Sequence, residues 1–343
     1  MQFRMSRFHS FCLVVAALVT GHVTETLAAS ATTSLADVKK SYVRPVDIPF
    51  PEANPYTPEK AELGKVLFFD PRLSGSQALS CASCHNASFG WQDGRPTGRG
   101  EGLKPLGRHS PTVMNHAWSE VFFWDGRADT LEQQAMGPIT ADVEMNMPIE
   151  KAVVALQAIP WYVKRFDAVF PGEGVTADTI PKAIATFERT IVSAWAPFDS
   201  WIAGDEYAIS DGAKRGFVLF NGKANCSACH SNWNFTDQSF HDIGLASEDI
   251  GRAKYMPEIQ EMKHAFKTPG LRNIDQRAPY MHNGSVPTIR AVIEHYNDGF
   301  RRRPSLSADM KPLGLTGGEI DDIVEFLATL TCAEPPVAVP LLP

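Results

Sequence analysis

Two short stretches, Cys81-Ala-Ser-Cys84-His85 and Cys226-Ser-Ala-Cys229-His230, decide how this sequence is interpreted. Each is a Cys-x-x-Cys-His motif, the attachment signature of a c-type haem. The two thiols add to the two vinyl groups of one haem, and the adjacent histidine binds the iron. A thioredoxin-like pair seldom carries the trailing histidine, and half of a zinc site would not explain a repeat of the whole pentapeptide. The sequence therefore predicts two covalently attached c-type haems, with His85 and His230 as iron ligands.

The composition is that of an ordinary globular protein. The chain has 343 residues, of which 44% are hydrophobic and 21% charged, and it is long enough for two domains. Its net charge of −7 argues against a nucleic-acid partner, because such proteins normally present a basic patch.

The N-terminus has a basic start, an apolar run from Phe11 to Val19 and small residues up to Ala29. These are the three parts of a secretory signal peptide. A buried amphipathic helix is the alternative, but the run shows no 3.6-residue pattern. We expect residues 1–28 to be a cleaved signal peptide and the mature protein to be periplasmic. No other segment is apolar enough for a bilayer, so no membrane association is expected after cleavage.

The surroundings of the two motifs repeat as well. Gly64-Lys-Val-Leu67-Phe68 precedes the first motif, and Gly216-Phe-Val-Leu219-Phe220 precedes the second. Both stretches are typical of the end of an amphipathic helix that leads into the haem-binding turn. This internal echo indicates two related haem domains in tandem.

Helical patterns dominate the rest of the chain. Helices are predicted from Thr176 to about Ala194 and from Gly318 to Leu330, and hardly any stretch alternates with period two. The first of these helices must stop before Pro197. We therefore predict a mainly α fold of two tandem cytochrome c-like haem domains with long loops. The N-terminal domain would span residues 29–195 and the C-terminal domain residues 196–343.

An electron carrier usually has side chains on both axial positions of each iron, whereas a catalyst must leave one position open. Four further stretches bear on this choice, and all resemble the bacterial di-haem cytochrome c peroxidase and MauG superfamily. They occur in the matching order between about residues 60 and 330. They are Glu62-Leu-Gly-Lys-Val-Leu-Phe-Phe-Asp-Pro-Arg-Leu-Ser74, Phe123-Trp-Asp-Gly-Arg-Ala128, Phe266-Lys-Thr-Pro-Gly-Leu-Arg-Asn273 and Ala278-Pro-Tyr-Met-His-Asn-Gly284.

The resemblance implies that the haem on His85 binds peroxide. The glutamine and glutamate of the family's distal pocket match Gln134 and Glu144. A glutamate above an open iron can take a proton from one peroxide oxygen and deliver it to the other. Trp124 matches the tryptophan that lies between the haems, where an indole relays charge in two short hops. A surface position for the two polar residues and a core position for the tryptophan are the structural alternatives.

Two departures from the peroxidase pattern concern iron ligands. Many of the peroxidases carry a histidine that caps the peroxide-binding haem, where this chain has Glu101, a poor ligand; His109 is a nearby substitute. The second ligand of the other haem is a methionine in the peroxidases and a tyrosine in MauG-type enzymes, and the matching residue is Tyr296. A phenolate favours high iron oxidation states more than a thioether does. Met281 and His282 are rival ligands.

Both departures favour the MauG-type branch, whose members use peroxide to oxidise aromatic side chains of a partner protein. The resemblance implies maturation of the tryptophan tryptophylquinone cofactor in the methylamine dehydrogenase precursor. The runner-up is a peroxidase that takes electrons from a small cytochrome or cupredoxin, and the non-enzyme alternative is a di-haem electron carrier. Ala224, just before the second motif, is not aromatic, so it provides no ring that could relay an electron toward a docked protein at that point. The family's interdomain calcium uses an asparagine where this chain has His109, although the carbonyls of Arg277 and Pro279 could still contribute.

Overall fold

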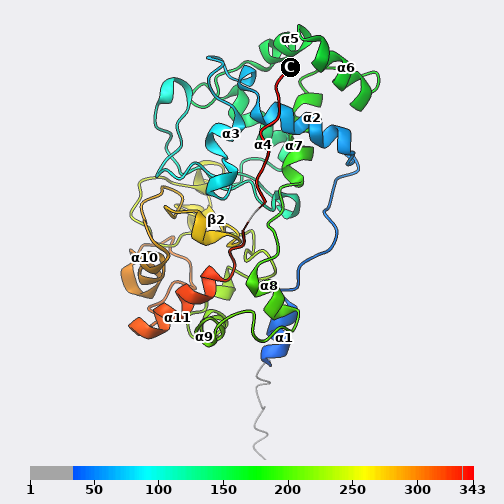
Figure 1. The fold of residues 1–343 in the computed structure, drawn as a ribbon. Coiled ribbons are helices and arrows are strands. Elements are labelled where there is room, and N and C mark those ends of the chain that lie inside the picture. Colours follow the sequence, from blue (N-terminus) through cyan, green and yellow to red (C-terminus); the bar gives the residue numbers. More distant parts are fainter. Residues whose placement is uncertain (1–33, 334) are drawn as a thin grey trace, which may run out of the picture. The chain divides into compact units, whose positions relative to one another are not determined.

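The structure is a computed structural model that describes residues 34–333 and 335–343, so the predicted signal peptide lies outside the described residues. Helices dominate the described part (Figure 1). The antiparallel pair β1 (Phe240–His241) and β2 (Phe266–Lys267) is its one sheet. The predicted mainly α fold is confirmed. The helices are α1 Leu35–Lys40, α2 Pro58–Phe69, α3 Cys81–Cys84, α4 Leu131–Thr140, α5 Ile149–Gln157, α6 Pro160–Val169, α7 Thr179–Arg189, α8 Pro197–Ile202, α9 Asp211–Asn221, α10 Ile289–Glu294 and α11 Gly317–Ala328.

The first hydrophobic core is built on α2 and α7, with α4 packed beside α7. α2 begins after Thr57, whose hydroxyl accepts the backbone N–H of Lys60, and Pro58 occupies its first turn. The two helices cross at Gly64, where an added Cβ would lie only 1.9 Å from the carbonyl oxygen of Ala183. α2 is buried on several faces, so the expected amphipathic pattern does not hold for it.

The second core repeats this arrangement with α9 and α11. Their crossing lies at Gly216, where an added Cβ would stand 2.0 Å from the carbonyl oxygen of Asp322. α11 starts with a capping box, in which the Thr316 hydroxyl and the Glu319 carboxylate each accept the other residue's backbone N–H. Gly64 and Gly216 are the matching positions of the sequence echo, so the echo marks two equivalent helix crossings.

An extended segment, residues 191–196, connects the two cores. α7 ends at Arg189, earlier than the predicted end near Ala194, because the β-branched residues Thr190, Ile191 and Val192 disfavour helix and the Ile191 carbonyl accepts the backbone N–H of Asn115. The first core draws its buried residues from positions 63–191 and the second from Tyr42 and positions 198–330. The boundary between residues 195 and 196 stays a prediction.

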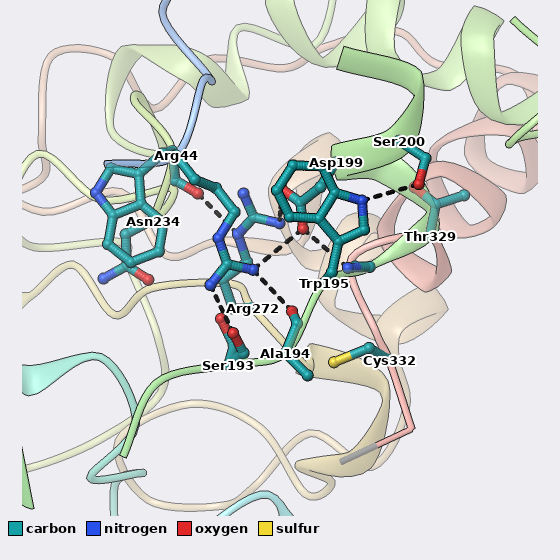
Figure 2. Close-up of polar contacts among 12 residues, drawn as sticks. Arg44, Ser193, Ala194, Trp195, Asp199, Ser200, Asn234, Arg272, Thr329 and Cys332 are labelled. Carbon is teal, nitrogen blue, oxygen red and sulfur yellow. Dashed lines mark hydrogen bonds and ion pairs between the residues drawn. The ribbon is translucent and has the colours of Figure 1, made fainter. Parts of the chain in front are cut away.

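A buried ion cluster anchors this connection (Figure 2). The Asp199 carboxylate pairs with Arg272 at 2.8 Å and with Arg44 at 3.2 Å, and it accepts the backbone N–H of Ala196 at 2.9 Å. Arg44 also donates to the carbonyl oxygens of Ser193 and Ala194. The cluster ties the N-terminal segment and the 191–196 connection to the second core.

The C-terminal tail returns from α11 to the first half of the chain (Figure 1). Val337 packs against the first core, and Arg72 donates a hydrogen bond to the Pro343 carbonyl oxygen. Across the described ranges, no helix has the length and apolar character needed to cross a bilayer.

Candidate functional site

The first Cys-x-x-Cys-His motif forms a single helical turn, α3, that presents its histidine to the interior. The His85 backbone N–H donates to the Cys81 carbonyl oxygen at 2.9 Å, which closes the turn. Its ring Nδ1 donates to the Trp91 carbonyl oxygen at 3.2 Å. Burial holds the pKa of His85 below its ordinary value, so the ring is neutral. Nε2 is therefore left with a lone pair that can bind a metal.

The second motif repeats this geometry in a short 3₁₀ turn, Cys226–Ala228. The His230 backbone N–H donates to the Cys226 carbonyl oxygen at 2.8 Å, and its Nδ1 donates to the Phe235 carbonyl oxygen at 2.8 Å. Burial again lowers the histidine pKa. None of the four motif cysteines forms a disulfide bond, so all four sulfur atoms are available for thioether bonds to a haem. Both motifs therefore fit a c-type haem.

A cavity of about 270 Å³ adjoins the second motif. Cys226, Cys229 and His230 line it, together with apolar side chains of the second core. The lining apolar residues include Phe220, Ile289, Ile293, Ile323 and Leu327. An apolar cavity with two thiols and a neutral imidazole is the environment that a covalently bound macrocycle needs.

Tyr296 lines the same cavity as His230. It belongs to a π-helical turn, His295–Gly299, that follows α10, and such turns often occur at functional sites. Burial raises the pKa of its phenol. Met281 also lines the cavity, so it remains a rival ligand. Met310 lines the cavity too and is a further candidate, which sequence reasoning missed because no motif marks its loop.

The other rival, His282, also lines the cavity, but its ring is held by contacts with protein side chains. Its ring stacks on Phe266 with centroids 3.6 Å apart, and its Nε2 lies 3.2 Å from the Ser247 hydroxyl oxygen. Of the three predicted candidates, Tyr296 and Met281 are therefore the better placed to bind a metal in this cavity.

Glu144 lies in the loop after α4, which packs on the segment that follows the first motif. An added Cβ at Gly100 would stand 1.8 Å from the Val143 carbonyl oxygen and 3.0 Å from the Glu144 Cα. Burial raises the pKa of Glu144, and the charge of Arg127 lowers it less strongly. The carboxyl group also exerts an electrostatic effect on the pKa of the Cys84 thiol, so it lies near the first motif.

Gln134 lies on α4, on the face that packs against Phe123. Its buried Oε1 accepts no hydrogen bond from the protein. Gly137, one turn further along, touches the Phe123 ring. Most buried side-chain oxygens accept a hydrogen bond, so this amide oxygen is available to a further partner.

Trp124 lines the cavity of the second motif and contacts segments from both halves of the chain. Its indole Nε1 donates to the His109 carbonyl oxygen at 2.8 Å, and its own carbonyl oxygen accepts the backbone N–H of Lys267 at 2.8 Å. The side chain lines the cavity together with His230. It is thus held by contacts to both halves of the chain.

At the first departure from the peroxidase pattern, the side chains of Glu101 and of its nearby substitute His109 both contact other protein groups. The Glu101 carboxylate accepts a hydrogen bond from the Ser76 hydroxyl at 3.2 Å. His109 is buried; its Nδ1 donates to the Arg95 carbonyl oxygen at 2.7 Å, and its Nε2 lies 3.0 Å from Oε1 of Gln92. Both ring nitrogens of His109 thus lie within hydrogen-bond distance of a protein oxygen, and its role as a substitute iron ligand stays a prediction.

Sequence reasoning missed three basic side chains that line the cavity, namely His116, Lys267 and the buried Arg277. Burial lowers the pKa of Lys267 to about 8 and that of Arg277 to about 10. It also missed Glu188, whose pKa burial raises to about 8 and whose Oε2 has no partner. Basic and acidic residues in loops or helices are normally solvated, so no local pattern distinguishes these four.

Comparisons with known proteins agree with this geometry. A family model described as di-haem cytochrome c peroxidase matches residues 58–207, and one described as RoxA-like, cytochrome c-like matches residues 265–299. The methylamine utilization protein MauG of Methylorubrum extorquens is 52% identical over 312 residues, which cover 90% of this chain and 88% of that protein. Cytochrome c551 peroxidase of Pseudomonas aeruginosa is 36% identical over 300 residues, 84% of this chain and 83% of the peroxidase. A crystal structure of a MauG-like protein associated with microbial copper homeostasis superposes with a TM-score of 0.78 at 30% identity, and covers 84% of this chain and 93% of the other.

Proposed function

Because this chain belongs to the di-haem cytochrome c peroxidase and MauG family, and is thereby a peroxide-dependent di-haem oxidoreductase, we propose that it uses hydrogen peroxide in the periplasm to oxidise a partner protein. The partner we propose is the methylamine dehydrogenase precursor, whose tryptophan tryptophylquinone cofactor would be completed by this oxidation. The similarity to a methylamine utilization protein over most of both chains supports this choice.

At each motif, the cysteines and the histidine would hold a haem in different ways. When bound, each haem supplies an iron for electron transfer, and the one at the first motif supplies the peroxide-binding position. Cys81, Cys84, Cys226 and Cys229 would carry the thioether bonds. The Nδ1 hydrogen bonds of His85 and His230 fix the tautomer of each ring, so that Nε2 would be the nitrogen that binds the iron.

Glu144 and Gln134 would handle peroxide at the first motif. Reduction of hydrogen peroxide to two waters consumes two protons and two electrons. A half-buried carboxylate can accept a proton from one peroxide oxygen and return it to the other, which assists cleavage of the O–O bond. The Gln134 amide, whose buried oxygen lacks a partner in the protein, would orient the bound oxygen by a hydrogen bond.

Trp124 would relay the electrons. It lies in the cavity that His230 lines, and its indole N–H is tied to the carbonyl oxygen of His109. An indole in a fixed position can give up an electron and regain it from the partner side, so one long transfer becomes two short ones. Its hydrogen bond keeps the ring orientation constant during this exchange.

The position of Tyr296 is the observation that favours the MauG-type branch of the family over the peroxidase branch. Its side chain lines the cavity of the second motif, where a phenolate ligand would favour storage of oxidising equivalents over a half-reduced resting state. Met281 and Met310 line the same cavity, and this supports the second candidate, a cytochrome c peroxidase supplied with electrons by a small cytochrome or cupredoxin.

Substitution of Tyr296 tests the proposal. With imidazole as a replacement ligand, Tyr296→His should keep a low-spin second haem and peroxide consumption, but lose oxidation of the methylamine dehydrogenase precursor. Tyr296→Met should raise the reduction potential of the second haem and yield peroxidase-like behaviour. Tyr207→His, at a fully exposed tyrosine, is the matched control and should change nothing.

The measurements are absorption and electron paramagnetic resonance spectra, a redox titration and the formation of quinone absorbance in the precursor. Unchanged spectra and potentials in both Tyr296 variants would show that Tyr296 is not a ligand. A methionine would then be assigned as the second ligand of this haem. A wild-type protein that turns over peroxide with a small cytochrome but never oxidises the precursor would favour the second candidate.

A further inference from the structure

Of the three positions at which the family resemblance implies calcium, His109 lacks the oxygen ligand, and the side chain of Arg277 brings a positive charge next to its carbonyl oxygen. Ca²⁺ takes six to eight oxygen ligands. His109 offers nitrogen atoms, and both are already engaged, with the Arg95 carbonyl oxygen and with Gln92. The Gln92 amide N–H₂ donates in turn to the Ala278 carbonyl oxygen at 3.4 Å, so this network occupies the surroundings of the predicted ligands.

The side chain of Arg277 brings a positive charge of its own to this region. It is 5% exposed and lines the cavity, and its aliphatic part passes so close to Gly90 that an added Cβ there would stand 2.7 Å from its Cγ. One guanidinium nitrogen donates to the Gly270 carbonyl oxygen at 2.6 Å, whereas the buried Nε has no partner. Among the described residues, no carboxylate forms an ion pair with Arg277.

A buried guanidinium without an acid is expensive unless a bound group supplies the negative charge. The propionate carboxylates of a haem are such a group, and Arg277 shares its cavity with Cys226 and His230 of the second motif. Lys267 lines the same cavity and lies close enough, like Arg277, to lower the pKa of His116 electrostatically. The region between the motifs is thus already rich in positive charge, which disfavours an additional divalent cation.

We propose that the Arg277 guanidinium pairs with a haem propionate. We also propose that this positive charge takes the place of the calcium ion expected between the domains, which the protein does not bind. This inference rests on the binding of two haems under the proposed function. The haem content of the purified holoprotein is therefore measured first, since a missing haem would contradict the proposed function and not the role of Arg277.

The first test is calcium itself. We expect the di-haem protein to contain no stoichiometric calcium by elemental analysis. Treatment with EGTA, followed by addition of CaCl₂, should leave its absorption spectrum, haem potentials and melting temperature unchanged. Stoichiometric calcium, or a spectrum that EGTA alters and CaCl₂ restores, would overturn the inference.

The second test removes the charge. A nearby positive charge favours the reduced haem, so Arg277→Gln should lower the ratio of reduced to oxidised haem at a fixed potential about ten-fold, equivalent to about 59 mV for one electron. Arg277→Lys, which keeps the charge, should restore most of this shift, and Arg165→Gln, at an exposed arginine on α6, should have no effect. His109→Asn/Arg277→Gln, which restores an oxygen ligand and removes the charge, should be stabilised by added CaCl₂. Equal potentials in the wild type and in Arg277→Gln would overturn the pairing with propionate.

Discussion

Replacement of Gly64 by alanine should separate α2 from α7 and destabilise the first haem domain. The glycine lies where the two helices cross, and an added Cβ would stand 1.9 Å from the Ala183 carbonyl oxygen and 2.9 Å from the Phe187 Cβ. Both of these atoms belong to α7, and the carbonyl oxygen is part of its backbone, so neither can be avoided by a change of rotamer.

The size of the effect follows from the displacement. An ordinary contact begins at 3.4 Å, so the helices must move apart by about 1.5 Å, the difference between 3.4 and 1.9 Å. Overpacking of a core typically costs about 1–3 kcal/mol, and a clash with backbone belongs at the upper end. Alanine's better helix propensity offsets less than about 1 kcal/mol of this. A net loss of about 2–3 kcal/mol would lower the melting temperature by roughly 4–12 °C.

Denaturant unfolding followed by circular dichroism at 222 nm measures this change, with the absorption spectrum of the first haem as a local probe. The local probe should respond, because Phe68 of α2 packs 6.5 Å from the His85 ring, measured between centroids. Gly318→Ala is the matched control, since no atom lies within 4 Å of an added Cβ at this exposed position of α11. It should be neutral or stabilising by up to about 1 kcal/mol. A Gly64→Ala protein as stable as Gly318→Ala would refute the assignment of Gly64 to a close helix crossing.

Three further predictions concern the motifs, the distal pocket and the ion cluster. Cys81→Ser/Cys84→Ser should remove one haem and peroxide reactivity together; a mass spectrum with one haem and undiminished peroxide turnover would contradict it. Glu144→Gln should keep both haem spectra but slow the reaction with peroxide roughly 10²–10⁴-fold in stopped-flow mixing. Because the carboxylate is the base, the wild-type rate should also fall as the pH drops below the raised pKa of Glu144, and the variant should lack this limb. Asp199→Ala should cost about 3–5 kcal/mol in denaturant unfolding, because it leaves the buried Arg272 without its acid, and a loss below about 1 kcal/mol would argue against the pair.

The echo of Gly-x-x-Leu-Phe before each motif illustrates what local sequence can predict. It indicated two related domains, and Gly64 and Gly216 do occupy equivalent crossings, α2 with α7 and α9 with α11. The predicted helix from Thr176 to Ala194 was too long at its C-terminal end, because an extended segment with its own hydrogen bonds replaces the last turn.

The sequence by itself determined the chemistry that depends on neighbours along the chain. Each Cys-x-x-Cys-His turn carries its thiols and histidine within five residues, and the apolar periodicity of the helices is equally local. The surroundings of these turns were decided only by tertiary structure. Arg277 and Lys267 share the cavity of the second motif because β2 and a loop distant from it in the sequence fold over it, and the loop of Glu144 packs at Gly100 on the segment that follows the first motif. A side chain's burial, pKa and partners depend on such long-range contacts, which residue type and spacing do not encode.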